Sequence, residues 1–232
     1  MRLLLMGLMV CFMASTSAYS QTRDLDSFNK LRVSGGIKVT LIKSSDSKAD
    51  IDMERGDYDD LITEVKGDVL TIKFKSKMLN WGNNNGKADI DLYFSTLESI
   101  DASAGCTIRG EDRIVTDEMD IDVSSGSTVS VEVETNDLTV DISSGASCTL
   151  SGSTDDQEVD VSSGATYRGR EMASKYTNVD VSSGATATVW ATERLVADAS
   201  SGATVRYKGN PKKKELDSGK WSGGSIKKLG GE

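Results

Sequence analysis

The sequence predicts an all-β protein whose second half is a right-handed parallel β-helix of about six recognisable coils. A motif of apolar residue, Asp, apolar residue, two small residues and Gly occurs six times, which chance does not explain. The glycines are separated by 21, 19, 19, 20 and 18 residues, so each copy corresponds to one structural unit. The six copies begin at Ile100, Ile121, Val140, Val159, Val179 and Ala197.

The first part of each copy predicts a β-strand with one buried face. The residues five and three positions before the glycine are apolar and often β-branched, and an aspartate always stands between them. Alternation with a period of two is typical of a strand that turns every second side chain inward. Stacking the copies therefore predicts an outward column made of Asp101, Asp122, Asp141, Asp160, Asp180 and Asp198.

A second strand is predicted after each glycine, because positions three and five residues later are again apolar or small. The glycine marks the corner between the strands, where two backbones come close and an unusual dihedral is needed. The residue two positions after the glycine is always Ser or Thr. We expect these hydroxyls to form a ladder that hydrogen-bonds between coils: Thr107, Thr128, Ser147, Thr166, Thr186 and Thr204.

The length of the repeat selects among repeat architectures. A unit of about 19 residues cannot bury its apolar face alone, whereas stacked units bury it against one another. Propeller repeats run to about 40–50 residues, leucine-rich repeats need a Leu/Asn framework, and no six-residue sub-period indicates a left-handed hexapeptide helix. A parallel β-helix is favoured, and six coils at about 4.8 Å each give a column of about 29 Å.

Two further regions flank or cover the repeats. We expect a strand-rich N-terminal region over 21–95 that covers the first coil, β-helix repeats over 96–210, and a polar C-terminal cap or tail over 211–232. The segment VSGGIKVTLI from Val33 looks like a degenerate copy of the repeat. Residues 80–87, which include Trp81, predict an exposed loop that is either a long connection or a binding loop. Candidate strands of the N-terminal region are Leu31–Ile42, Ala49–Met53, Leu61–Val65, Val69–Lys75 and Ala88–Phe94.

The first 20 residues predict a secretory signal peptide. Arg2 is followed by an apolar run over 3–13, and Ala18-Tyr19-Ser20 fits a cleavage site before Gln21. The run is about half as long as a membrane-spanning helix, and Cys11 lies inside it, which argues against a lipoprotein signal. We therefore expect an exported, soluble mature chain with no transmembrane segment, located in the periplasm or at the cell surface.

Charge and composition exclude several functions. The net charge is −9 and the sequence shows no basic stripe, so neither nucleic acid nor an anionic membrane is an expected partner. The chain contains no histidine, which removes Ser-His-Asp and Cys-His catalysis and His-ligated zinc. No cofactor is expected.

The two cysteines that remain after export are expected to be unbonded. Cys106 and Cys148 fall on the first and third coils, about 9.6 Å apart along the stack. A disulfide needs Cα atoms within about 7 Å. Cys148 occupies an inward column, so it should be a buried and inert thiol.

Two chemistries remain open for the repeat surface. The aspartate column is interpreted mainly as a solvated structural feature, with its six carboxylates as weak candidates for calcium binding. The alternative to a binding or structural module is a polysaccharide lyase or hydrolase, since such enzymes can use carboxylates and arginine without histidine. Its candidate residues are the aspartates together with the outward-pointing Arg109, Arg168 and Arg206.

The chain resembles the putative auto-transporter adhesins with a head GIN domain, which are common in Bacteroidetes-type bacteria. The resemblance rests on the leader, the opening VSGGIKV, the strand Leu70-Thr71-Ile72, the junction LESIDASAGC and the recurring D-[VI]-S-S-G-A. It implies a β-helix related in shape to pectin lyases but without catalytic residues, and a role in adhesion at the cell envelope. The extended surface of stacked repeats suits a polysaccharide or an envelope protein as the partner. One departure is Phe94-Ser95-Thr96-Leu97, where the family leads us to expect a proline-containing segment.

Overall fold

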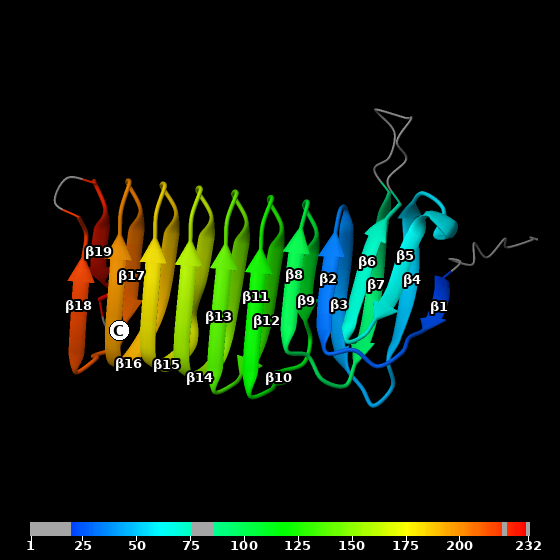
Figure 1. The fold of residues 1–232 in the computed structure, drawn as a ribbon, viewed down its shortest axis with the longest axis horizontal. Coiled ribbons are helices and arrows are strands. Elements are labelled where there is room, and N and C mark those ends of the chain that lie inside the picture. The colour runs from blue at the N-terminus through cyan, green and yellow to red at the C-terminus, as the bar shows by residue number, and fades with distance from the viewer. Residues whose placement is uncertain (1–19, 76–85, 220–221, 231–232) are drawn as a thin grey trace, which may run out of the picture.

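The computed structural model describes residues 20–75, 86–219 and 222–230. The predicted signal peptide up to residue 19 and most of the predicted loop over 80–87, with Trp81, lie outside these residues. The described chain is almost entirely β-strand and forms an elongated parallel solenoid, as predicted (Figure 1). Within the described ranges, none of the helices is long and apolar enough to cross a membrane.

Each coil of the repeat region contains two strands joined by the glycine turn, and strands of successive coils pair in parallel. One layer contains β8 (Ser99–Ser103), β11 (Glu118–Val123), β13 (Asp137–Ile142) and the second parts of β14 (Ser147–Val161), β15 (Thr166–Val181) and β16 (Thr186–Ala199). The other contains β9 (Thr107–Gly110), β12 (Thr128–Glu134), the first parts of β14 to β16, and β17 (Thr204–Lys208). The short β10 (Ile114–Val115) pairs with the end of β12.

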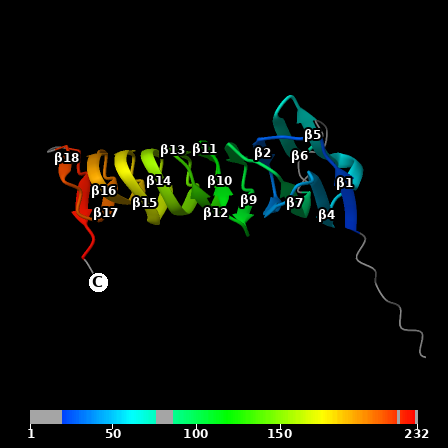
Figure 2. The ribbon, with the colours of Figure 1, turned by 90° about the horizontal axis from the view of Figure 1, so that it is seen from below.

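The two layers lie back to back, as the view from below shows for β11 and β13 against β9 and β12 (Figure 2). We call the outer surface of the layer with β8, β11 and β13 the aspartate face. The outer surface of the layer with β9, β12 and β17 is called the hydroxyl face. The repeat region contains six such coils, one for each copy of the motif, which agrees with the number predicted from the sequence.

The glycine turn has two consecutive residues with positive φ. The residue before each glycine has φ between 51° and 57°, and the six glycines have φ between 69° and 81°. Ser127 N–H donates to Ser124 O at 3.1 Å, which makes this a hairpin-type turn with two left-handed central residues. A Cβ on the repeat glycines would meet no atom within 4 Å. The expected close approach of backbones is therefore wrong, and the dihedral alone explains the glycine.

The turns also bind successive coils to one another. The amide of Gly126 donates to Ser144 O at 3.1 Å, and that of Gly145 donates to Ser163 O at 3.1 Å.

The residue after each glycine is fully inside the coil and must be small. Cys106, Ser127 and Ala146 are all 1% exposed or less, which explains their size.

The interior is one continuous apolar core that runs from Phe28 to Tyr207. Tyr167 is the one aromatic side chain in an inward column of the repeat region that otherwise contains small or aliphatic residues, and it is fully buried. Gly169 makes room for it, because a Cβ there would lie 2.6 Å from the tyrosine hydroxyl. Gln157 Nε2 donates to this hydroxyl at 2.5 Å, so the buried phenol has a polar partner. Cys106 and Cys148 are not bonded to each other and Cys148 is buried, both as predicted, and Cys106 is buried as well.

The predicted hydroxyl ladder after the glycine is wrong. Among the described residues of that column, Ser147 accepts a hydrogen bond from Arg168, and no hydroxyl-to-hydroxyl bond joins the coils. Hydroxyls that bind neighbouring coils lie instead at the opposite bend. There, Thr135 Oγ1 donates to Asp117 O at 2.8 Å and Thr154 Oγ1 donates to Asn136 O at 2.8 Å. Outward threonines face water, whereas these buried ones need a partner.

The N-terminal region adds two coils in an order that differs from the order of the chain. β2 (Lys30–Ser34) and β3 (Ile37–Lys43) form a coil that pairs with β8 and β9 on one side. On the other side it pairs with β6 (Val69–Phe74) and β7 (Lys87–Phe94). The segment VSGGIKVTLI is therefore a coil of the solenoid, as its likeness to the repeat predicted.

Antiparallel strands cover the N-terminal end. β5 (Leu61–Lys66) extends one layer beyond β6, while β4 (Lys48–Arg55) and β1 (Ser20–Asp24) extend the other beyond β7. A single 3₁₀ turn, η1 (Tyr58–Asp60), joins the layers. Arg23 of β1 connects them by donating to Leu61 O and Tyr58 O, each at 2.7 Å. This arrangement covers the end of the solenoid core.

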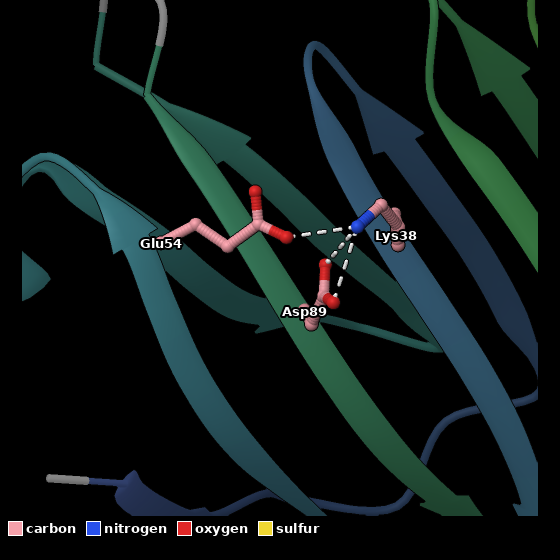
Figure 3. A network of polar contacts seen from close by, with 3 residues as sticks. All are labelled: Lys38, Glu54 and Asp89. Carbon is pink, nitrogen blue, oxygen red and sulfur yellow. Dashed lines mark hydrogen bonds and ion pairs between the residues drawn. The ribbon is translucent and has the colours of Figure 1, made fainter. Parts of the chain in front are cut away.

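Ion pairs join the coil of β2 and β3 to the strands on its N-terminal side. Lys38 Nζ of β3 lies 2.8 Å from Glu54 of β4 and 3.1 Å from Asp89 of β7 (Figure 3). The cation is shared by two carboxylates across three strands.

The C-terminal segment forms a last, polar coil. β18 (Lys213–Asp217) pairs in parallel with β16, and β19 (Ser225–Lys228) pairs in parallel with β17. Lys214 and Lys228 stand in the register of the inward residues Leu195 and Tyr207. Charged residues at inward positions of an end coil prevent further strands from adding to its open edge.

Candidate functional site

The predicted aspartate column exists and is longer than predicted. Strand pairing places Asp101, Asp122, Asp141, Asp160, Asp180 and Asp198 directly next to one another in successive coils. Asp217 of β18 adds a seventh carboxylate at the C-terminal end. Arg32 of β2 ends the column at the other end, with Nε 2.7 Å from Asp101 Oδ2.

Sequence reasoning missed Asp217 and Arg32, although a signal for each was present. Asp217-Ser218-Gly219 resembles the repeat motif, but the apolar residues around it are few. Leu31-Arg32-Val33 has the apolar alternation of the repeat with arginine at the aspartate position. Aligning the degenerate coils to the clear ones would have found both residues.

The environment of the column raises the pKa of several carboxyl groups. For Asp122, Asp141 and Asp160 the main cause is partial burial, and neighbouring carboxylates raise the pKa further. The pKa of Asp198 is raised by the same two causes, with Asp180 and Asp217 as the neighbouring carboxylates. Crowding of like charge thus acts in the expected direction, but desolvation contributes more.

Other acidic residues flank the column on the aspartate face. Asp120 and Glu158 occupy the next outward column, and Glu118, Asp137 and Asp156 occupy the one beyond it. Three adjoining shallow grooves run over this face, and one of them is lined by Tyr176 and Arg194 as well as by acidic residues. In the parts of the chain that the structure describes, no three carboxylates or thiols gather around a common point that could hold a metal ion. The column offers one carboxylate per coil.

The hydroxyl face has a different character. The ladder residues Thr107, Thr128, Ser147, Thr166, Thr186 and Thr204 form one outward column that continues to Ser225. The next outward column reads Arg109, Ser130, Thr149, Arg168, Thr188, Arg206 and Lys227. The absence of a basic stripe in the sequence is therefore misleading, because coil stacking brings these cations into one line.

The cations of this column differ in their partners from Lys38 and Arg113. Lys38 and Arg113 are each neutralised by two carboxylates. In contrast, no ion pair with a described carboxylate is formed by Arg109, Arg168, Arg206 or Lys227.

The structure separates the residues of the hydrolase or lyase alternative. The aspartates point outward from one layer, and Arg109, Arg168 and Arg206 point outward from the opposite layer. The core lies between the two, so one substrate cannot contact both sets at once. The Arg-plus-Asp site expected under this alternative is not formed.

Sequence reasoning also missed an aromatic contact on the hydroxyl face. Lys208 Nζ lies 3.7 Å from the centre of a Trp190 ring. Beside them is a small pocket lined by Arg170, Lys208, Lys228 and Glu171 among others. Trp190 stands at an outward position of its strand, which the alternation alone could have indicated.

Comparison with known proteins places the chain among described folds. Residues 27–211 match the family model described as "Putative auto-transporter adhesin, head GIN domain". A Bacteroides fragilis protein described as a putative adhesin has a TM-score of 0.83 at 18% identity, covering 93% of this chain and 98% of its own. A putative adhesin of Parabacteroides merdae gives 0.67 at 17% identity, covering 91% and 96% of the two chains.

A third solved structure is described by a different activity. It is a putative lipid binding protein of Parabacteroides distasonis, with a TM-score of 0.65 at 18% identity, covering 92% of this chain and 98% of its own. At these identities the solved structures show that the fold is shared. No curated protein matches the chain.

Proposed function

Since this chain belongs to the family described as putative auto-transporter adhesins with a head GIN domain, we propose that it is an exported, non-catalytic binding protein of the cell envelope. It holds a partner on the outward side chains of its solenoid. The signal peptide predicted over 1–20 supports export, and an adhesive role follows the family description.

One observation carries the proposal. Parallel sheets are usually covered on both faces, but each layer here buries only its inner surface against the other layer. The outer side chains, such as Asp141, Arg168 and Arg206, are exposed to solvent in unbroken columns over successive coils. Such extended regular surfaces suit a long or repetitive partner.

The separation of Arg109, Arg168 and Arg206 from the aspartate column supports binding over catalysis. A lyase or hydrolase would need carboxylates on both sides of the scissile bond, or a carboxylate next to an arginine, around a common substrate. The two residue sets lie on opposite faces, whereas a binding protein needs no such convergence.

The location is tested by protease shaving of intact cells that express the full chain. We expect the protein to start at Gln21 and to be degraded in intact or osmotically opened cells, while a cytoplasmic marker survives. An uncleaved chain that is degraded only after complete lysis would contradict export.

Binding is tested with the purified mature chain on an array of polysaccharides and envelope extracts. We expect retention that survives washing and is lost when outward residues of one face are changed. Retention that is unaffected by changes on either face, or turnover of any polysaccharide on the array, would contradict the proposal.

A further inference from the structure

The C-terminal half of the hydroxyl face carries a concentration of positive charge on a protein whose net charge is −9. Arg168, Thr188, Arg206 and Lys227 follow one another in register along one column. At about 4.8 Å per coil, the two arginines stand about 10 Å apart and Lys227 follows about 5 Å later. This column provides a line of cations along the solenoid axis.

Two more cations lie beside this column. Arg170 and Lys208 line the small pocket, and both are close to Glu171, at 3.8 Å and 3.6 Å respectively. One carboxylate therefore serves two cations. We call the five residues Arg168, Arg170, Arg206, Lys208 and Lys227 the basic patch.

The surroundings of the basic patch favour a sugar polymer as the partner. The adjoining column on the side of the glycine turns consists of Ser and Thr hydroxyls, which donate and accept hydrogen bonds as sugar hydroxyls require. Trp190 supplies a flat indole surface whose neighbouring ammonium group, on Lys208, stands 3.7 Å from a ring centre.

Two other occupants fit less well. A stable protein partner needs a buried apolar centre, but the large apolar side chains that are most exposed lie elsewhere. Tyr176 is on the aspartate face, Leu216 stands in register with the inward Ala197 at the C-terminal end of the solenoid, and Val115 is at the bend opposite the glycine turns. An anionic membrane would also meet the carboxylates of an acidic protein as it approaches.

We propose that the basic patch binds an acidic polysaccharide, meaning a chain of sugars that carries carboxylate or sulfate groups at intervals. This inference rests on the proposed function and names the partner class and the face. The carboxylate or sulfate groups pair with Arg168, Arg206 and Lys227, and the sugar hydroxyls bind the adjoining column of Ser and Thr. The aspartate face repels the same polymer, so the polymer docks on one side only.

The test measures binding of the mature chain to polygalacturonate, dextran sulfate and neutral dextran at low and moderate salt. A double variant, Arg168→Gln with Arg206→Gln, is compared with a control, Arg194→Gln with Lys213→Gln. The control removes the same charge from the aspartate layer, where Arg194 and Lys213 stand in register. Thermal melting of each variant confirms that it is folded.

We expect binding to both acidic polymers but not to dextran, and weakening as salt screens the contacts. The patch variant should lose about tenfold in affinity and the control less than about twofold, since each exposed ion pair contributes modestly. Equal losses in the two variants, or equal binding of dextran, would overturn the inference.

Other partners give results of their own. Tighter binding to phosphatidylglycerol vesicles or duplex DNA than to either polymer would overturn the polysaccharide assignment. Concentration-dependent self-association that the patch variant abolishes would assign the patch to a second copy. Binding of a neutral glycan through another surface would leave the proposed function standing and remove only this inference.

Discussion

Arg32 Nε lies 2.7 Å from Asp101 Oδ2 and so ends the aspartate column with an opposite charge. The side chains are 58% and 34% exposed, which makes this a surface pair. The arginine belongs to the coil of β2 and β3, which precedes the repeats in the sequence by more than 50 residues. The pair therefore marks the junction between the N-terminal coil and the first coil of the repeat region.

The first prediction concerns this junction. Arg32→Gln should lower the free energy of unfolding by about 0.5–1 kcal/mol at neutral pH, the usual range for an exposed ion pair. The same change in an Asp101→Asn background should have almost no effect, because the partner is already neutral. Chemical denaturation of the four proteins measures the coupling. Equal losses in both backgrounds would show that the pair does not stabilise the fold.

The second prediction concerns pH. The folded-state pKa values of Asp122, Asp141 and Asp160 are raised, chiefly by partial burial. The unfolded chain therefore releases these protons at lower pH than the folded one, and stability falls as pH rises from about 3.9 through the raised pKa. The penalty is absent below the unfolded value and complete above the folded one.

Asp141→Asn removes one of these carboxyl groups and tests that sign. The melting temperature at pH 7 should rise by on the order of 1–2 °C, a small change because solvent screens the column. The gain should vanish near pH 3. Asp91→Asn on β7 is the control, since it lies outside the column. A loss of stability at pH 7, or a gain that persists at low pH, would refute the mechanism.

The third prediction separates screening from specific binding of a cation. Sodium chloride should raise the melting temperature at neutral pH by weakening repulsion along the column. Calcium chloride at matched ionic strength should add little, because the column presents one carboxylate per coil and calcium takes six or more oxygen ligands. A large calcium-specific gain that Asp141→Asn or Asp160→Asn abolishes would identify a metal site.

The fourth prediction compares an inward with an outward position. Val161 is 2% exposed inside the coil, so Val161→Asp buries an unpaired charge and should cost more than about 4 kcal/mol. Thr188 points outward, in register between Arg168 and Arg206. Thr188→Asp should therefore be nearly silent or slightly stabilising. Comparable losses in melting temperature for the two variants would contradict the assignment of faces.

The coils of the repeat region could be predicted because the two-residue alternation of their strands determines which side chains point outward. A shift by one residue would turn every aspartate inward, so alternation around Asp122 or Asp160 identified the outward column. The free cysteines followed from the same geometry. The other strands of the N-terminal region were also found, since their apolar alternation is clear, but β1, which has no such alternation, was missed.

The remaining features depend on stacking order or on bends. The coil of β2 and β3 is the first coil along the chain, but it lies between the coil of β6 and β7 and the coil of β8 and β9. The alternation of apolar residues contains no information on that order. Arg168 and Arg206 seemed scattered because they belong to different copies of the repeat, and only the coil places them in one line. Thr135 and Thr154 bind neighbouring coils at the bend opposite the glycine turns, where the sequence repeats less strictly.

The most direct test of the binding account is a footprint on the two faces. In the mature chain, from which the predicted signal peptide with Cys11 has been removed, Cys106 and Cys148 are buried, and burial raises the pKa of both thiols. This chain is therefore a silent background for thiol labelling. Single variants Thr188→Cys and Asp141→Cys place a reactive thiol on the hydroxyl face and the aspartate face. The account predicts that polygalacturonate or an envelope extract slows labelling at position 188 but not at position 141. Protection at position 141 alone would contradict the assignment of the partner to the hydroxyl face, and protection at neither position would contradict the binding account.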